Sequence, residues 1–174
     1  GYLPSETTVV SVSGNLVIAP GACLDAFTLG TVTVGGNVLV GQGAILALGC
    51  TAGSLGPPFD QPPCKGQTTS DVVWGSILAT RALTMYLDGN TIHGNVVSVG
   101  GGPGATLSPY INFPIKDNEI FGSVLVTGWH GAWFGALRNT IHGSAAFAFN
   151  QGVTTGDFGE LDSNEVVQNT VYGS

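Results

Sequence analysis

The sequence predicts an all-β solenoid, a chain of short strands that stack in repeated coils. The main observation is a two-residue motif, Gly followed by Asn or Ser, whose clear copies begin at Gly14, Gly36, Gly75, Gly94, Gly122 and Gly143. A degraded seventh copy is expected at Gln168-Asn169. A β-branched residue precedes each copy by two positions; these residues are Val12, Val34, Val73, Ile92, Ile120, Ile141 and Val166. Copies at intervals near 22 residues, with insertions only between them, are typical of a solenoid whose coils bury one another.

Composition supports a single all-β domain over residues 1–174 and excludes several kinds of partner. Hydrophobic residues make up 43% of the chain and charged residues only 9%. No apolar run is long enough for a membrane helix, so membrane insertion is not expected. No segment keeps a helical apolar period for several turns. Four Lys and Arg against eleven Asp and Glu give a net charge of −7, which disfavours nucleic acid and anionic membrane surfaces.

Alternating apolar residues bounded by Gly, Asn, Asp and Pro place the strands in order along the chain. They are expected at residues 9–12, 31–34, 38–40, 90–93, 96–99, 118–121, 124–127, 139–142 and 164–167. Two or three strands per repeat, without hairpin signals, require each coil to return and pair in parallel with the coil before it. The chain thereby resembles the right-handed parallel β-helices of the pectin-lyase-like superfamily over residues 8–172. The resemblance implies a single-stranded β-helix of about seven coils, and no catalytic motif of the family accompanies it.

Aligning the repeats on the motif predicts columns of polar side chains along the stack. Four positions before the motif stand Asp71, Asn90, Asn118, Asn139 and Asn164. Side-chain amides stacked in this way can hydrogen-bond the coils above and below, so we expect a structural ladder. One and two positions earlier, Asp117 faces Arg138 and Asp88 faces Lys116 on neighbouring coils. We expect two exposed ion pairs, each contributing about 0–1 kcal/mol.

An outward column of rings directly precedes the motif. Its members are Trp74, His93, Phe121, His142 and Val167, and beside it stand Val72, Thr91, Glu119, Thr140 and Glu165. One interpretation is a ligand-binding face on which Glu119 and a neighbouring histidine, His93 or His142, act as an acid/base pair. The other interpretation is an aromatic stack that rigidifies the coils. These three residues are the candidates for catalysis, although no motif identifies the chain as an enzyme.

Insertions between the repeats predict loop excursions near residues 51–70, 100–114, 128–136 and 150–160. The third contains the densest group of aromatic residues, with Trp129, His130, Trp133 and Phe134. Tryptophan faces stack on the C–H surfaces of sugars, so these four residues are the candidates for carbohydrate binding. Packing over a coil edge or in an oligomer interface is the alternative.

Cysteines and histidines suggest a compartment but no cofactor. Cys50 and Cys64 flank the first excursion and are expected to form a disulfide, whereas Cys23 aligns with Ile45 and is expected in the core. One disulfide indicates an extracellular or cell-surface protein, in which Gly1 begins a processed or trimmed chain. No metal site is expected, because His93 and His142 lie two coils apart with a phenylalanine between them. No cofactor is expected either.

Two functions from different classes follow. The leading hypothesis is a non-catalytic extracellular structural protein that associates with itself through its coil ends or its aromatic loops. The alternative is a carbohydrate-binding or polysaccharide-degrading β-helix, which would make a polysaccharide the partner. An ice- or mineral-binding surface is a third, weaker hypothesis, because Glu119 and Glu165 interrupt the outward threonine column.

Overall fold

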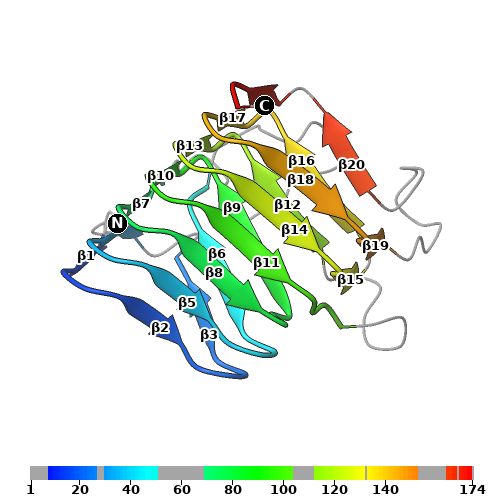
Figure 1. Cartoon of the computed structure of the whole chain (residues 1–174). Coiled ribbons are helices and arrows are strands. Elements are labelled where there is room, and N and C mark those ends of the chain that lie inside the picture. Colours follow the sequence, from blue (N-terminus) through cyan, green and yellow to red (C-terminus); the bar gives the residue numbers. More distant parts are fainter. Residues whose placement is uncertain are drawn as a thin grey trace, which may run out of the picture.

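The computed structural model of the chain describes residues 8–26, 30–50, 69–103, 112–131, 133–152, 164–167 and 169–173 (Figure 1). This part is all-β: it contains strands and turns and no helix. Most strands belong to three parallel sheets. A small fourth sheet pairs β15 (His130–Gly131) with β19 (Gln151–Gly152).

Each of the three large sheets contains about one strand in three along the chain. Sheet 1 contains β1 (Thr8–Val12), β4 (Gly30–Val34), β7 (Val72–Val73), β10 (Thr91–Ile92), β13 (Glu119–Ile120), β17 (Thr140–Ile141) and β21 (Thr170–Val171). Sheet 2 contains β2 (Leu16–Ile18), β5 (Val38–Val40), β8 (Ile77–Thr80), β11 (Val96–Val99), β14 (Val124–Thr127) and β18 (Ala145–Ala148). Sheet 3 contains β3 (Cys23–Asp25), β6 (Ile45–Leu48), β9 (Thr84–Asp88), β12 (Asn112–Lys116), β16 (Trp133–Leu137) and β20 (Asn164–Val167).

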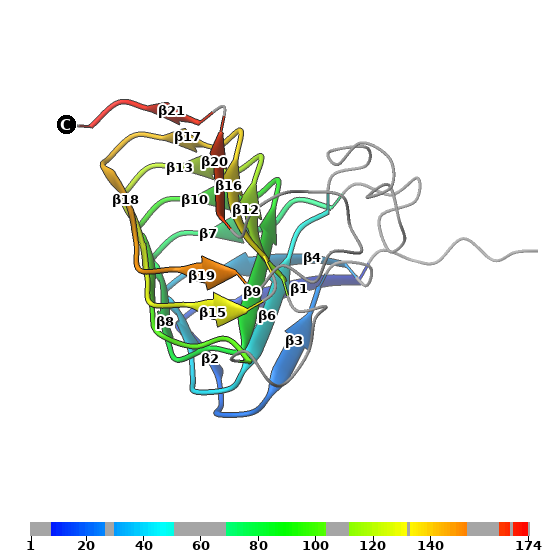
Figure 2. The ribbon, with the colours of Figure 1, turned by 90° about the vertical axis from the view of Figure 1, so that its right-hand side faces the viewer.

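The chain passes from sheet 1 to sheet 2 to sheet 3 and back, and we call one such passage a circuit (Figure 2). Each strand pairs in parallel with the equivalent strand of the neighbouring circuit, as β1 does with β4 and β2 with β5. The predicted all-β class with stacked parallel strands is confirmed, and the arrangement is compatible with a parallel β-helix. Within the described ranges, antiparallel pairing is limited to the isolated bridge between Cys50 and Thr69.

Backbone contact between circuits explains why the motif begins with glycine. A Cβ added to Gly75, Gly94 or Gly122 would lie 2.5–2.6 Å from the carbonyl oxygen of the motif glycine one circuit earlier. These same glycines donate backbone hydrogen bonds to that carbonyl, at 3.0 Å from Gly75 to Gly36 and 2.9 Å from Gly94 to Gly75. A larger residue would force the circuits apart, so the turn between sheets 1 and 2 requires glycine.

The second residue of the motif forms a ladder of its own. The backbone N–H of each member donates to the side-chain oxygen of the member one circuit earlier, at 2.8–3.0 Å; the members are Asn15, Asn37, Ser76, Asn95, Ser123 and Ser144. We call this the motif ladder. Only Asn and Ser recur here because a short oxygen-bearing side chain reaches the next circuit's N–H. The motif is visible in the sequence, but this role of its second residue was not predicted.

The core lies between the three sheets and follows the predicted inward column. Val34, Val73, Ile92, Ile120 and Ile141 are completely buried. Burial of each such side chain contributes about 1.5–3 kcal/mol relative to exposure. Larger residues fill the later circuits; the largest are Trp129, Phe113 and Phe134.

The last repeat was aligned wrongly from the sequence. Asn164 belongs to β20 of sheet 3, which pairs with β16, and Val166 is 48% exposed instead of buried. The true repeat starts at Asn169, since Thr170 and Val171 pair with Thr140 and Ile141. Its motif glycine is Gly173, which donates to the carbonyl of Gly143. The segment from Asn169 repeats the pattern of Asn139-Thr140-Ile141-His142-Gly143, whereas Gln168-Asn169 only resembles the motif.

The cysteines require a second correction. Cys23 is free and lies opposite Ile45, as predicted, but it is exposed instead of buried. In these strands Leu24 and Leu46 face the core, so the outward positions fall on Cys23 and Ile45. Cys50 is disulfide-bonded. The predicted partner, Cys64, lies outside the described residues, so the pairing stays a prediction.

The predicted excursions have different outcomes. Most of 51–70, 100–114 and 150–160 lies outside the described residues. The segment 128–136 is not a loop, because most of it forms β15 and the first part of β16. In β16 the aromatic neighbours Trp133 and Phe134 differ in burial, so the apolar–polar alternation that marks a strand is missing from the sequence.

Candidate functional site

A column of five stacked rings runs along the outer face of sheet 1, next to the turn into sheet 2. We call it the aromatic column; its members are Trp74, His93, Phe121, His142 and Tyr172. Successive ring centroids are 4.1, 5.0, 4.6 and 5.3 Å apart, and the first three pairs are within 6° of parallel. The predicted column is therefore present, with Tyr172 in the place assigned to Val167. The spacing of the rings follows the spacing of the parallel strands that carry them.

Stacking determines what this column can bind. A sugar or flat ligand binds an aromatic side chain through the face of its ring. In the aromatic column the faces of His93, Phe121 and His142 lie against neighbouring rings, so mainly their edges reach solvent. The geometry favours the rigidifying interpretation over a continuous sugar-binding platform.

Glu119 and His142 are brought together as the acid/base hypothesis required. Their Oε1 and Nε2 atoms lie 3.4 Å apart, and their side chains are 50% and 37% exposed. The pair sits on the outer face of a sheet, where water screens the interaction. His93 is one circuit further and stacks between Trp74 and Phe121. A catalytic role for these three residues stays a prediction.

The four candidate carbohydrate-binding residues do not share one surface. Trp129 is completely buried, and its indole N–H donates to the carbonyl of Leu83 at 3.0 Å. Phe134 is also buried in the core, where it packs edge-on against Phe113 at 5.6 Å. Trp133 is half-buried, with its ring where a Cβ on Gly135 would lie, and His130 is exposed. The expectation of an exposed platform is wrong for Trp129 and Phe134, because this segment contributes to a sheet and to the core.

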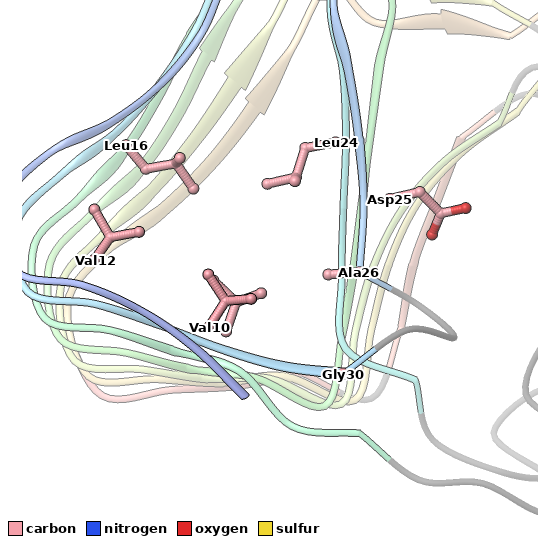
Figure 3. Close-up of a pocket in the computed structure, with 8 residues that line it drawn as sticks. Val10, Val12, Leu16, Leu24, Asp25, Ala26 and Gly30 are labelled. Carbon is pink, nitrogen blue, oxygen red and sulfur yellow. The ribbon is translucent and has the colours of Figure 1, made fainter. Parts of the chain in front are cut away.

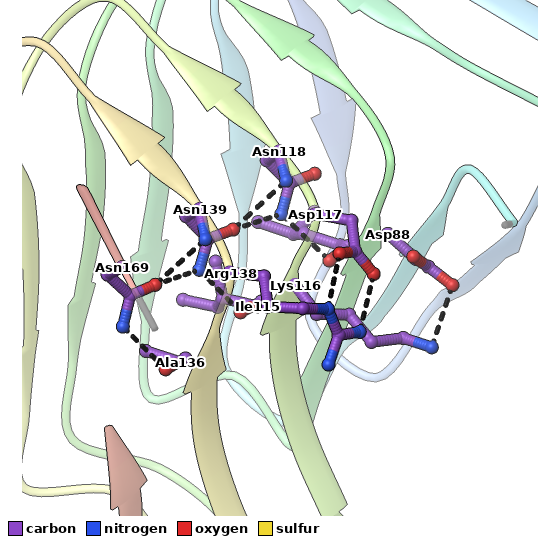
Figure 4. Close-up of polar contacts among 10 residues, drawn as sticks. Asp88, Ile115, Lys116, Asp117, Asn118, Ala136, Arg138, Asn139 and Asn169 are labelled. Carbon is purple, nitrogen blue, oxygen red and sulfur yellow. Dashed lines mark hydrogen bonds and ion pairs between the residues drawn. The ribbon is translucent and has the colours of Figure 1, made fainter. Parts of the chain in front are cut away.

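The asparagine ladder is present and buried at the turn between sheets 3 and 1 (Figure 4). The backbone N–H of each member donates to Oδ1 of the next, at 2.9 Å from Asn90 to Asn118 and 3.1 Å from Asn118 to Asn139. Each side-chain amide donates to a main-chain carbonyl, as Nδ2 of Asn118 does to Leu87 at 2.9 Å. Asn169 occupies the last position, which corrects the assignment of Asn164. The ladder satisfies buried backbone groups that a turn would otherwise leave unpaired.

Asp71 begins the asparagine ladder and differs from the other members in its chemistry. Its two carboxylate oxygens accept from the backbone N–H of Val32 at 2.6 Å and of Gly49 at 2.8 Å. The side chains at the asparagine positions face one N–H donor and one carbonyl acceptor, which suits an amide. The side chain of Asp71 faces two N–H donors, which suits a carboxylate. Burial raises the pKa of Asp71 from 3.8 to about 6, and the two backbone hydrogen bonds lower it in part.

The predicted ion pairs form between neighbouring circuits, and one is less exposed than expected. Nζ of Lys116 lies 2.9 Å from Oδ2 of Asp88, with the side chains only 8% and 2% exposed. Arg138 holds both carboxylate oxygens of Asp117, at 2.7 and 2.8 Å (Figure 4). Removing one partner of the buried pair leaves an uncompensated charge, which typically costs about 3–5 kcal/mol. Both pairs hold circuits together, which leaves them no evident role in binding.

One end of the stack carries an apolar hollow. Its lining comes from the first two circuits and consists of Val10, Val12, Leu16, Leu24, Asp25, Ala26, Gly30 and Val32 (Figure 3). The aliphatic side chains point into the space inside the coil, whereas Asp25 points away from it. Val10 is 45% exposed. Among the described strands, β1, β2 and β3 are the outermost of their sheets at this end, so each has one edge that no described strand pairs.

The outer face of sheet 2 is also apolar, and sequence analysis missed it. One outward column along this sheet consists of Val17, Leu39, Leu78, Val97, Leu125 and Ala146. Val17 is 64% exposed, and no strand of sheet 2 contains a charged residue. Parallel strands that are apolar on both sides usually belong to sheets covered on both faces. The signal in the sequence was the run of apolar residues after each motif, at both inward and outward positions.

Comparisons with known proteins give no relative: no protein-family model matches the chain, and neither a curated protein nor a solved structure matches it significantly. The described residues bring no three metal-ligating side chains together. A search of the same residues for a membrane-spanning helix finds none. Function therefore has to be inferred from the surfaces described above.

Proposed function

We propose that the chain is a right-handed parallel β-helix of about seven coils, in the manner of the pectin-lyase-like superfamily, and that it acts as a non-catalytic structural protein. In this role it associates with itself outside the cell. The disulfide at Cys50 supports an oxidising compartment. The open apolar hollow at the end formed by β1, β2 and β3 is the observation that carries the proposal.

An exposed apolar hollow bordered by unpaired strand edges favours association with another polypeptide. Its aliphatic side chains lose unfavourable contact with water when covered, and the strand edges gain backbone partners. The strands at the opposite end, β21, β18 and β20, run in the same direction within each sheet. An end of a second copy therefore suits this surface. Repeated contact between opposite ends is heterologous and open, and it extends into filaments.

The other polar features support a structural role because they already bind circuit to circuit. The asparagine ladder and the two ion pairs each connect neighbouring circuits. The aromatic column does the same on the outer face of sheet 1. Of the two association surfaces expected from the sequence, burial of Trp129 and Phe134 disfavours the aromatic loop and leaves the coil end.

A charge placed in the hollow tests the proposal. Val10 lines the hollow and is partly exposed. In the variant Val10→Lys, the aliphatic part of the lysine side chain can therefore lie on the apolar surface while its ammonium group reaches water. A stacked second copy would bury that charge. Val17→Lys is the matched control, because Val17 lies in the same circuit, is 64% exposed and faces outward from sheet 2.

Sedimentation velocity over a wide range of concentration, with electron microscopy of the same samples, gives the result. We expect the wild type and Val17→Lys to form larger species as concentration rises, and Val10→Lys to stay monomeric. A wild type that is monomeric throughout, or a Val10→Lys variant that associates like the wild type, would contradict the proposal.

A further inference from the structure

The two ends of the aromatic column differ in what lies beyond them. Tyr172 directly follows β21, the outermost strand of sheet 1, whereas Trp74 directly follows β7, with β4 and β1 continuing the sheet past it. One face of the Trp74 ring covers His93, at 4.1 Å and 4° from parallel. Within the described ranges no other ring contacts Trp74, which is 58% exposed. Its second face is therefore open along the direction in which the column runs.

In the two described circuits below this face, small residues take the positions that carry rings elsewhere. Val34 pairs with Val73 and Val12 with Val34, so Gly35 and Ser13 occupy the ring positions of the two earlier circuits. Both are exposed. A Cβ at Gly35 would lie 2.6 Å from the carbonyl oxygen of Ser13, so this position cannot carry a side chain without a backbone shift. At about 4.8 Å per strand, two ring positions stand vacant over about 9.6 Å.

The vacant positions have the geometry of a stacking site. Rings in the column are spaced like the strands, and those from Trp74 to His142 lie nearly parallel. A planar ring stacked on the open face of Trp74 would thus lie beside Gly35, one strand spacing from Trp74, as His93 does on the other face. The strands on this side, β1, β4 and β7, contain no charged residue, while Ser11, Ser13 and Thr33 provide hydroxyl groups. The surroundings favour a ligand without net charge.

We propose that the open face of Trp74, above Gly35 and Ser13, binds a neutral planar aromatic ring that extends the aromatic column. This site lies on the outer face of sheet 1, whereas the hollow is lined by side chains that point inside the coil, so the proposal does not depend on self-association. A saturated ring lacks the flat π-face that the other members of the column present to one another. Aromatic ligands should therefore be preferred to sugars.

The three tryptophans of the chain make the proposal directly measurable by NMR. The probe is 2-naphthol, and its control is the saturated analogue decahydro-2-naphthol. Titration of ¹⁵N-labelled wild type should move the indole N–H signal of Trp74 by ring-current shielding, saturably, with a dissociation constant on the order of 1 mM for a single stacking contact. The buried indole of Trp129 should not move.

Variants assign the site and separate the alternatives. Trp74→Ala should abolish saturable binding, and Trp74→Phe should retain it at severalfold lower affinity, both measured by saturation transfer from 2-naphthol. Trp133→Ala, which removes the other partly exposed indole, should bind like the wild type. Unchanged binding by Trp74→Ala, or no saturable shift of Trp74 in the wild type, would overturn the proposal. A saturable shift with cellobiose but not with 2-naphthol would overturn it in favour of a glycan site.

Discussion

The first two strands of sheet 1 and the five that follow them are built differently, although the motif ladder runs through both. β1 and β4 are five residues long, whereas β7, β10, β13, β17 and β21 are two residues long. At the asparagine-ladder position the early circuits have Val10 and Val32, and at the ring position, directly after the strand, they have Ser13 and Gly35. In the later circuits the asparagine ladder precedes these strands and the aromatic column follows them.

Cohesion between neighbouring circuits is therefore distributed unevenly along the stack. The early circuits depend on backbone pairing and the motif ladder, and their apolar side chains are more exposed, with Val9 at 68% and Val10 at 45%. The later circuits add buried hydrogen bonds at every turn and a second contact between rings. We therefore expect the early circuits to open at lower free energy than the later ones. The hollow that we propose as the association surface lies in this weaker region.

The largest effect is expected from breaking the asparagine ladder in the stronger region. Asn118→Ala leaves the N–H of Asn90 without an acceptor and the carbonyl of Leu87 without its donor, both in a buried turn. Each buried unpaired group costs about 1–3 kcal/mol, so with two such groups the free energy of unfolding should fall by about 2–6 kcal/mol. Asn95→Ala is the matched control in the exposed motif ladder, and it should cost less than about 1 kcal/mol. Equal losses in urea unfolding would contradict the assigned difference between the two ladders.

A smaller, pH-dependent effect is expected at Asp71, where the two regions join. Its folded pKa, about 6, lies above the ordinary value of 3.8, so the folded state binds this proton more tightly between those values. The contribution of Asp71 to the free energy of unfolding should therefore decline by about 3 kcal/mol as pH rises from about 4 to about 6. Asp71→Asn removes this titration and turns an amide N–H toward the N–H of Gly49.

Urea unfolding of both proteins at a series of pH values measures that contribution as a difference. The gap, which is the free energy of unfolding of the wild type minus that of Asp71→Asn, should narrow as pH rises from about 4 to about 6. A gap that is constant with pH would show that Asp71 does not titrate there. A gap that widens would mean that its folded pKa is lowered.

Much of the fold was predictable because one steric requirement repeats. Close backbone contact at the turn between sheets 1 and 2 admits only glycine, so the motif marks each circuit. The asparagine ladder and the ring column followed from that alignment. The prediction was wrong where the motif is degraded. Gln168-Asn169 resembles the motif, so the last repeat, which begins at Asn169, was aligned in the wrong register.

The candidate site was less predictable because it depends on which way each side chain points. Cys23 was placed opposite the correct neighbour and still assigned to the wrong side of its strand, since a one-residue change reverses inward and outward positions. Trp129 and Phe134 looked like a surface cluster, and only the three-dimensional packing sends both into the core. The hollow and the open face of Trp74 depend on side chains from several circuits, which no single repeat reveals.

The central claim, that the weaker end of the stack is the association surface, can be tested by hydrogen–deuterium exchange at increasing protein concentration. At low concentration, amides of β1, β2 and β3 should exchange faster than those of β10, β11 and β14, which lie within the stack. As concentration rises, protection should increase at β1, β2 and β3 and at the opposite outermost strands, β18 and β21, and stay constant in the interior strands. Exchange at both ends that does not change with concentration, or new protection confined to the outer face of sheet 2, would contradict the claim.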